Sequence, residues 1–178
     1  MKKTLLITLT LISLASFSSS AQDAKSAFKI NPLSALLRTG SVFYEHKLSK
    51  KESFQLGAAY LGLKIEDVKF SGFSVTPEYR YYPKENALSG LYIGPYLRYQ
   101  NLTVKDETNK GSYSSVGGGV VLGRQWAYKS GFVLDLFFGP SYNSGKVKAD
   151  DGSEEPDVSV SAIDGFGIRT GILIGFSL

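Results

Sequence analysis

The hydrophobic residues of this chain alternate with polar or small ones, most completely in its last fifteen residues. From Asp164 to Leu178, one parity holds large apolar residues, and the other holds mainly glycine together with Arg169. Alternate side chains of a β-strand point to opposite faces, so the segment predicts a strand with one apolar face. Barrel strands in a bilayer turn that face to lipid and place small or polar residues in the lumen, and this segment fits that arrangement.

The same alternation recurs along most of the chain, and no segment keeps a helical apolar stripe for more than one or two turns. The alternating segments run for about 8–14 residues, the length that a tilted strand needs to cross a bilayer. They cover residues 41–48, 53–60, 73–82, 91–100, 115–126 and 132–142.

The connections between these segments alternate in length. Short ones at 49–52, 84–89 and 129–130 separate longer polar ones at 65–71, 104–112 and 144–157. Outer-membrane barrels have short periplasmic turns and longer extracellular loops, so the lengths assign a direction to every strand. Segment 41–48 must then descend, which requires an ascending strand before it. Residues 27–36 are the only candidate, although Pro32 interrupts them.

These eight segments predict an all-β fold, a closed eight-stranded antiparallel up-and-down transmembrane β-barrel of the size of OmpA- and OmpX-type barrels. Outward aromatic residues then form two girdles. One lies at the periplasmic strand ends and the other at the extracellular ends, with Phe54, Tyr81, Trp126, Phe132 and Phe176 in the first and Tyr60, Phe73, Tyr99, Tyr142 and Phe166 in the second.

Three prolines fall inside the predicted strands. Pro77, Pro95 and Pro140 each remove a donor from the strand ladder, so we expect local bulges or bends at these positions.

The amino-terminal residues have the composition of an export signal. Lys2 and Lys3 precede an apolar run over residues 4–17, and Ser19-Ser20-Ala21 provides small residues at a cleavage site. We therefore expect a signal peptide over residues 1–21 and an outer-membrane β-barrel domain over residues 22–178. Removing two lysines and no acid lowers the net charge from +4 to +2, which does not favour nucleic-acid binding. The chain has no cysteine, which excludes disulfides and thiolate metal sites.

Six charged residues fall on the inward parity of the predicted strands. They are the acids Glu45, Glu78 and Asp135 and the arginines Arg80, Arg98 and Arg169. The lumen of an eight-stranded barrel is just wide enough to be filled by side chains, and buried charges are costly unless paired. We therefore predict a structural salt-bridged plug. A proton or ion path is the functional alternative, whereas a carboxylate pair for glycoside chemistry would need a sugar-sized cleft.

Candidate catalytic and metal-binding residues are few, and we predict no catalytic, cofactor or metal site. His46, the only histidine, falls on the lipid-facing parity near a periplasmic strand end, and no GxSxG motif accompanies it. The acidic residues of 150–157 offer oxygen ligands for Ca²⁺ but lack the EF-hand spacing, so a solvated loop is expected.

Several short motifs occur in an order that resembles a known family. They are KINPL at 29–33, YE at 44–45, TPEYRYY at 76–82, GPYLRY at 94–99, LGRQW at 122–126 and GP at 139–140. This order resembles the family catalogued as domain of unknown function 3575. The resemblance covers nearly all of the mature chain. It implies a small β-barrel of the Gram-negative outer membrane without an established activity, and it implies that the strand prolines belong to the family pattern.

The sequence thus predicts a small non-enzymatic outer-membrane barrel with a side-chain-filled lumen and an envelope-structural or surface-interaction role. Expected partners are outer-membrane lipid and lipopolysaccharide, the barrel-assembly machinery acting on the carboxyl-terminal strand, and an extracellular partner at loops 65–71, 104–112 and 144–157. The alternatives are a narrow transport pore, a lipid-modifying barrel, and a soluble periplasmic lipocalin-like barrel with inverted parity.

Overall fold

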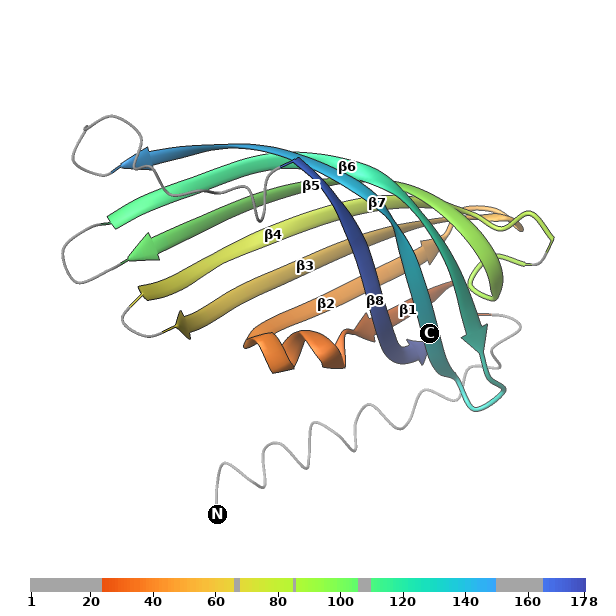
Figure 1. Ribbon diagram of the computed structural model, residues 1–178. Coiled ribbons are helices and arrows are strands. Elements are labelled where there is room, and N and C mark those ends of the chain that lie inside the picture. Colours follow the sequence, from red (N-terminus) through yellow and green to blue (C-terminus); the bar gives the residue numbers. More distant parts are fainter. Residues whose placement is uncertain (1–23, 66–67, 85, 106–109, 150–164) are drawn as a thin grey trace, which may run out of the picture.

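The computed structural model describes residues 24–65, 68–84, 86–105, 110–149 and 165–178. Within these ranges the antiparallel strands form a closed barrel in sequence order (Figure 1). The elements are β1 (Ser26–Ile30), the 3-10 helix η1 (Pro32–Leu37), β2 (Thr39–Lys47), β3 (Glu52–Ile65), β4 (Val68–Tyr81), β5 (Gly90–Lys105), β6 (Lys110–Ala127), β7 (Phe132–Ala149) and β8 (Gly165–Ser177). The predicted eight-stranded up-and-down β-barrel is confirmed.

Burial alternates along the strands with charged residues inside and apolar residues outside. Arg80 and Asp135 are 0% exposed, whereas Leu97 is 64% and Phe138 is 61% exposed. In β2, Ser41, Phe43 and Glu45 are buried while Val42 and Tyr44 between them are exposed. The predicted inside-out parity is therefore confirmed, and the soluble alternative, which needs the opposite parity, does not fit this barrel.

Glycines on the inward parity make room for aromatic rings on the neighbouring strand. Gly171 lies directly opposite Phe137 in the ladder, and a Cβ on this glycine would lie 2.5 Å from Phe137 Cζ. The same arrangement joins Gly123 to Tyr92 and Gly57 to Phe43. Since a methyl group at any of these glycines would overlap a ring, glycine is required for this packing.

The first strand is shorter than the predicted 27–36. β1 ends at Ile30 because the side chain of Asn31 caps a 3-10 helix by accepting hydrogen bonds from the backbone N–H groups of Leu33 and Ser34. Pro32 follows at the first helical position, where its fixed φ and missing N–H are tolerated. The prediction of a strand through Leu36 was therefore wrong, and Pro32 marked the change.

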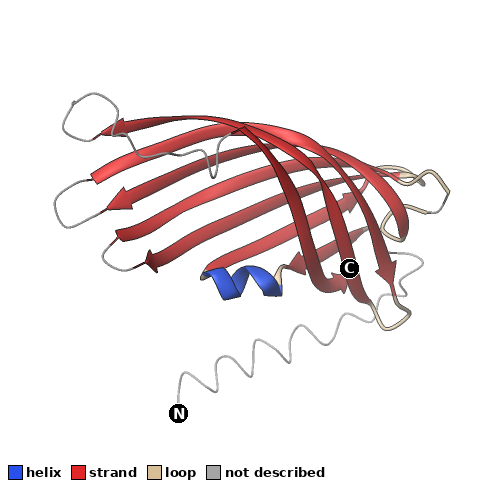
Figure 2. Ribbon diagram, viewed as in Figure 1, coloured by secondary structure: helices blue, strands red, loops and turns tan. Residues whose placement is uncertain are grey.

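The barrel closes where β1 pairs with β8, and we call this contact the seam. Because β1 is short, the seam is paired over only part of the length of β8. β1 pairs with β8 only through Ala27 to Ile30 on one side and Ile174 to Ser177 on the other. The backbone N–H of Leu178 donates to the carbonyl of Ser26 at 2.7 Å. We call this end of the barrel the terminus end and the opposite end the loop end. η1 lies beside the seam on the loop side of β1 (Figure 2).

The strand prolines do not produce bulges. The register of β4 and β5 is the same at Val75↔Tyr99 and at Tyr81↔Ile93, on both sides of Pro77 and Pro95. β6 and β7 likewise keep one register on both sides of Pro140. The expectation of bulges was wrong, because each ladder skips the pairs around its prolines without inserting a residue.

At the loop end of the barrel, several strands extend farther than the sequence predicted. β3 and β4 pair up to Ile65↔Val68, β5 and β6 up to Lys105↔Lys110, and β7 runs to Ala149. Most of the predicted loops 65–71 and 104–112, and the first part of 144–157, are therefore strand. The predicted signal peptide 1–21 and the acidic residues 150–157 lie outside the described residues. Among the described residues, no helix is long and apolar enough to cross a membrane.

Candidate functional site: the luminal ion-pair network

Six charged side chains meet inside the barrel near the terminus end. They come from five strands, and each is at most 6% exposed. We call this group the luminal network, and its members are Lys29 of β1, Glu45 of β2, Glu78 and Arg80 of β4, Asp135 of β7 and Arg169 of β8. Three positive and three negative side chains make the network formally neutral.

Arg80 connects all three acids of the network. Its Nε lies 2.6 Å from Glu78 Oε1, and its Nη1 lies 2.7 Å from Asp135 Oδ2 and 3.2 Å from Glu45 Oε2. The planar guanidinium presents donors in fixed directions, which lets one side chain bridge carboxylates from three strands. The Arg80 guanidinium carbon also lies 4.1 Å from the centre of the Tyr92 ring, at cation–π distance.

Lys29 on β1 binds the same acceptors as Arg80 on β4. Its Nζ lies 2.5 Å from Glu45 Oε2, 2.9 Å from Asp135 Oδ2 and 2.7 Å from Gln125 Oε1. The three donor hydrogens of an ammonium group therefore have three partners. Lys29 and Arg80 share Glu45, Asp135 and Gln125, so the chain's first and fourth strands are tied through β2, β6 and β7.

Arg169 and Glu78 extend the network toward the loop end. Arg169 Nη1 lies 2.5 Å from Glu78 Oε2, while the other oxygen of Glu78 accepts from Arg80. The Arg169 guanidinium carbon lies 4.3 Å from the Tyr96 ring centre and 4.7 Å from that of Phe137. Arg169 is thus held between a carboxylate and two aromatic faces.

Neutral donors satisfy the remaining carboxylate oxygens. Glu45 Oε1 accepts from the hydroxyls of Ser53 at 2.5 Å and Tyr82 at 2.7 Å. Asp135 Oδ1 accepts from the Tyr92 hydroxyl at 2.8 Å. Buried ions cost several kcal/mol each when left unpaired, so these partners offset the cost of burying the three carboxylates.

The segment after β4 folds under the network at the terminus end. Tyr82, Ala87 and Leu88 are at most 5% exposed, and Gln125 Nε2 donates to the Leu88 carbonyl at 2.8 Å. The backbone N–H groups of Tyr82 and Ala87 donate to the carbonyls of Lys51 and Lys50. This turn therefore covers the lumen at the terminus end and is anchored to the β2–β3 turn.

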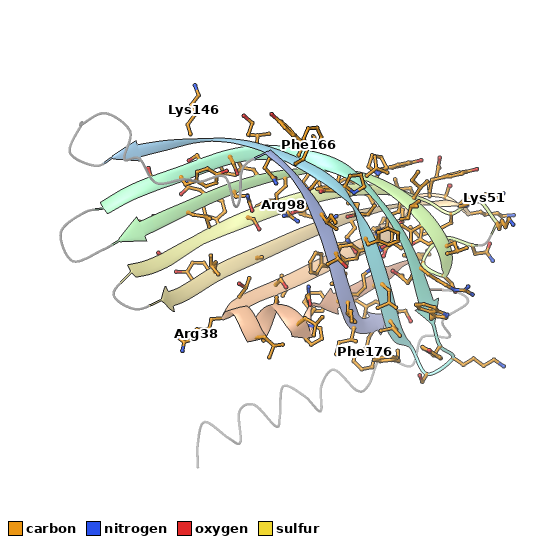
Figure 3. All side chains as sticks on the ribbon, viewed as in Figure 1. Arg38, Lys51, Arg98, Lys146, Phe166 and Phe176 are labelled. Carbon is orange, nitrogen blue, oxygen red and sulfur yellow. The ribbon has the colours of Figure 1, made fainter. Side chains whose placement is uncertain are left out.

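The structure brings together five of the six predicted luminal residues: Glu45, Glu78, Arg80, Asp135 and Arg169. Arg98 also faces inward (Figure 3), but within the described residues no carboxylate pairs with it, and its buried Nε has no hydrogen-bond partner. The β4–β5 register explains this difference, because Glu78 pairs with Tyr96 and Arg98 lies two residues nearer the loop end.

Lys29 was absent from the predicted network although it had the right parity. The sequence signal that could have identified it is the alternation of Lys29 with Phe28 and Ile30, which are both 42% exposed. Lys29 is 0% exposed and makes two of the network's ion pairs.

The remaining candidate residues do not form a second site. His46 is exposed, and its Nδ1 lies 2.8 Å from Ser26 Oγ, which also contacts the Tyr44 hydroxyl. This Ser–His contact was not predicted, and no carboxylate completes it among the described residues. No cluster of three or more potential metal ligands occurs within the same ranges.

Comparisons with known proteins place the fold in context. The family model described as "Protein of unknown function (DUF3575)" matches residues 6–177. A comparison with curated proteins found no match. Among solved structures, the crystal structure of a major outer membrane protein from Thermus thermophilus is similar at 12% identity and a TM-score of 0.48, covering 86% of this chain and 99% of that chain.

Proposed function

The chain belongs to the family described as "Protein of unknown function (DUF3575)", and from this membership and the barrel's geometry we propose that it is a small non-enzymatic protein of the outer membrane. Its lumen is closed by the luminal network. Its role is structural in the envelope or lies in surface interactions at the loop end. The terminus end faces the periplasm.

The exposed apolar surface supports the membrane location. Outward residues such as Leu56, Leu97 and Phe138 are 45%, 64% and 61% exposed, and they continue around the barrel wall. Soluble proteins rarely expose so continuous an apolar surface, whereas a barrel in lipid requires it. All ten residues assigned to the two aromatic girdles lie on this outer face, and Phe132 contacts Phe176 while Tyr142 contacts Phe166 across strands.

The packing of the luminal network supports the proposal that the lumen is closed. Arg80, Lys29, Glu45 and Asp135 are all 0% exposed and joined by ion pairs of 2.5–3.2 Å. Ions passing this layer would have to break several buried ion pairs, each of which is costly to disrupt. The network therefore supports a structural plug over a pore.

Membrane insertion is tested by extracting the protein from the outer-membrane fraction with detergent and comparing its gel mobility before and after boiling. We expect a heat-dependent mobility shift, because a closed barrel resists dodecyl sulfate until heated. Recovery as a freely soluble periplasmic protein would contradict the proposal.

Planar-bilayer recordings test the closed lumen. We expect no steady conductance from the wild-type barrel and ion-conducting openings from the double variant Arg80→Ala/Lys29→Ala, provided it remains folded by the mobility assay. Steady wild-type conductance would instead support the transport-pore alternative.

The lipid-modifying alternative is tested by mass spectrometry of lipid A from cells with and without the protein. A change in the mass of lipid A is required for this alternative.

A further inference from the structure

Several buried polar groups inside the barrel have no hydrogen-bond partner, and most of them surround Glu78. Among the described residues, these groups include both side-chain amide atoms of Gln55, Nη2 of Arg80 and the hydroxyl of Tyr96. Gln55 is directly opposite Glu78 on β3, and Tyr96 is directly opposite it on β5. Arg80 follows two residues later on β4 and donates to Glu78 through Nε at 2.6 Å. The unpartnered groups therefore gather on three neighbouring strands around one carboxylate.

This site is almost fully buried in the lumen. Gln55 and Arg80 are 0% exposed, Glu78 is 1% exposed and Tyr96 is 5% exposed. The residues that flank these four along their strands, and those that pair with them on the neighbouring strands, all belong to the described part of the chain. The unpaired groups are therefore a feature of the described packing.

Glu78 also accepts fewer hydrogen bonds than the other two acids of the luminal network. Within the described residues it accepts two, one at each oxygen, from Arg80 and Arg169. Glu45 accepts four, and Asp135 accepts three. Each oxygen of a carboxylate has about two lone pairs for hydrogen bonding, so both oxygens of Glu78 can accept one more.

The chemistry of these groups selects the kind of molecule that can bind them. A buried donor or acceptor without a partner destabilises the folded state, because it has lost its hydrogen bonds to water. Arg80 and Tyr96 offer donors here, the Gln55 amide offers both a donor and an acceptor, and Glu78 offers lone pairs. An anion would be repelled by Glu78 and a cation by Arg80. A small neutral molecule that both donates and accepts fits the whole set.

We propose that the barrel holds internal water at this site, bound between Glu78, Gln55 and Arg80. Such water accepts from Arg80 Nη2 or the Gln55 amide and donates to Glu78. Buried waters make about three hydrogen bonds to groups that are otherwise unpaired, and they are part of the folded structure. The plug is then made of side chains and ordered water together, and the water completes the hydrogen bonding around Glu78.

Nuclear magnetic resonance of the full-length barrel in detergent micelles tests the site directly. A rotating-frame Overhauser cross-peak between water and the side-chain amide protons of Gln55 reports water bound beside this amide. The Gln125 side chain is the internal control, because its Nε2 donates to the Leu88 carbonyl at 2.8 Å. We expect a cross-peak at Gln55 and none at Gln125. No cross-peak at Gln55, or equal cross-peaks at both, would overturn the proposal.

Hydroxyl protons that exchange with solvent can imitate bound water in this measurement. The variants Ser53→Ala, Thr76→Val and Tyr96→Phe each remove one hydroxyl from a position near Gln55 or Glu78. We expect the Gln55 cross-peak in all three. Its loss in one of them would assign the signal to that hydroxyl and would contradict the proposal.

The direction of a stability change provides an independent test. Gln55→Met keeps the length of the side chain and removes its amide. If no water were bound, this substitution would remove unpaired groups and raise the urea midpoint. With bound water it removes hydrogen bonds, so we expect the unfolding equilibrium constant to rise about fivefold, as for the loss of one average hydrogen bond. A midpoint equal to or above that of the wild type would rule the proposal out.

Replacing chloride by gluconate at constant ionic strength distinguishes water from a bound anion. We expect the wild-type urea midpoint to be the same in both salts. A midpoint that falls in gluconate for the wild type but not for Arg98→Gln would show that the luminal arginines bind an anion, against the proposal. Folding of each variant is checked by heat-dependent gel mobility, and the wild-type cross-peak decides the question if Gln55→Met does not fold.

Discussion

Lys29 and Asp135 lie 106 residues apart in the chain, yet Lys29 Nζ lies 2.9 Å from Asp135 Oδ2 inside the barrel, near the terminus end. Both side chains are 0% exposed. The pair joins the first strand to the seventh, which flank β8 in the barrel, and the same Asp135 oxygen also accepts from Arg80 at 2.7 Å. A single carboxylate therefore holds two buried cations.

Asp135→Asn tests the importance of this carboxylate. The amide keeps the shape but leaves Lys29 and Arg80 with one fewer negative partner in a buried site, so we expect a loss of about 3–5 kcal/mol in the free energy of unfolding. Urea unfolding of the detergent-folded barrel, followed by tryptophan fluorescence, measures the loss. A value unchanged from wild type would show that the network contributes little to stability.

Lys29 and Glu45 should be energetically coupled. We expect Lys29→Met and Glu45→Gln each to destabilise the barrel, and the double variant to lose less than the sum of the two, because no unpaired charge of this pair then remains. The coupling free energy should exceed about 1 kcal/mol for residues in such contact. Additive losses in the urea double-mutant cycle would contradict an energetic role for the 2.5 Å contact.

Arg98 and Arg80 provide a matched pair of luminal arginines. Arg80→Gln removes three ion pairs and should cost about 3–5 kcal/mol. Within the described residues, Arg98→Gln removes a guanidinium that lies 5.8 Å from the Tyr96 ring centre and has no ion-pair partner, so we expect a loss of less than about 1 kcal/mol. Similar losses in the two variants, measured by urea unfolding, would show that Arg98 has a partner of comparable strength.

Gly171→Ala tests the packing of aromatic rings over luminal glycines. The added methyl would lie 2.5 Å from Phe137 Cζ, and we expect a loss of about 1–3 kcal/mol from overpacking. The double variant Gly171→Ala/Phe137→Leu should recover part of this loss. Gly40→Ala is the control, since nothing lies within 4 Å of a Cβ at that position. Equal unfolding temperatures for Gly171→Ala and Gly40→Ala would argue against the ring contact.

The sequence alone predicted the strand parity and the topology of the barrel. Residues such as Phe138 and Leu97 could be assigned to the outside because alternation is a local property with a period of two residues. The ends of the strands were harder to predict, and the sequence placed the loop ends of β3 to β7 several residues too early. There the outward positions change from apolar residues to serine and lysine, a pattern that resembles a loop when strand pairing is unknown.

The membership of the luminal network depended on the tertiary structure. Lys29 and Arg98 both carry a positive charge on the inward parity, but only Lys29 reaches the acids. On β5, Arg98 lies two residues nearer the loop end than Tyr96, which pairs with Glu78. On β4, Arg80 lies two residues nearer the terminus end than Glu78. The two arginines are therefore about 13 Å apart along the strand direction. The height at which inward side chains meet is decided by the register between strands and by where each strand begins.

Parity and the number of strands thus follow from the sequence, since both arise from alternation within single segments. Connection length was a poorer guide, because the connection from Ile65 to Val68, predicted to be long, is shorter than the one from Tyr81 to Gly90. The presence of Lys29 and the absence of Arg98 in the luminal network, and the end of β1 at Ile30, were decided only in three dimensions. The physical reason is that luminal contacts and cross-strand rows join residues far apart in the chain, and their positions depend on how the whole barrel closes.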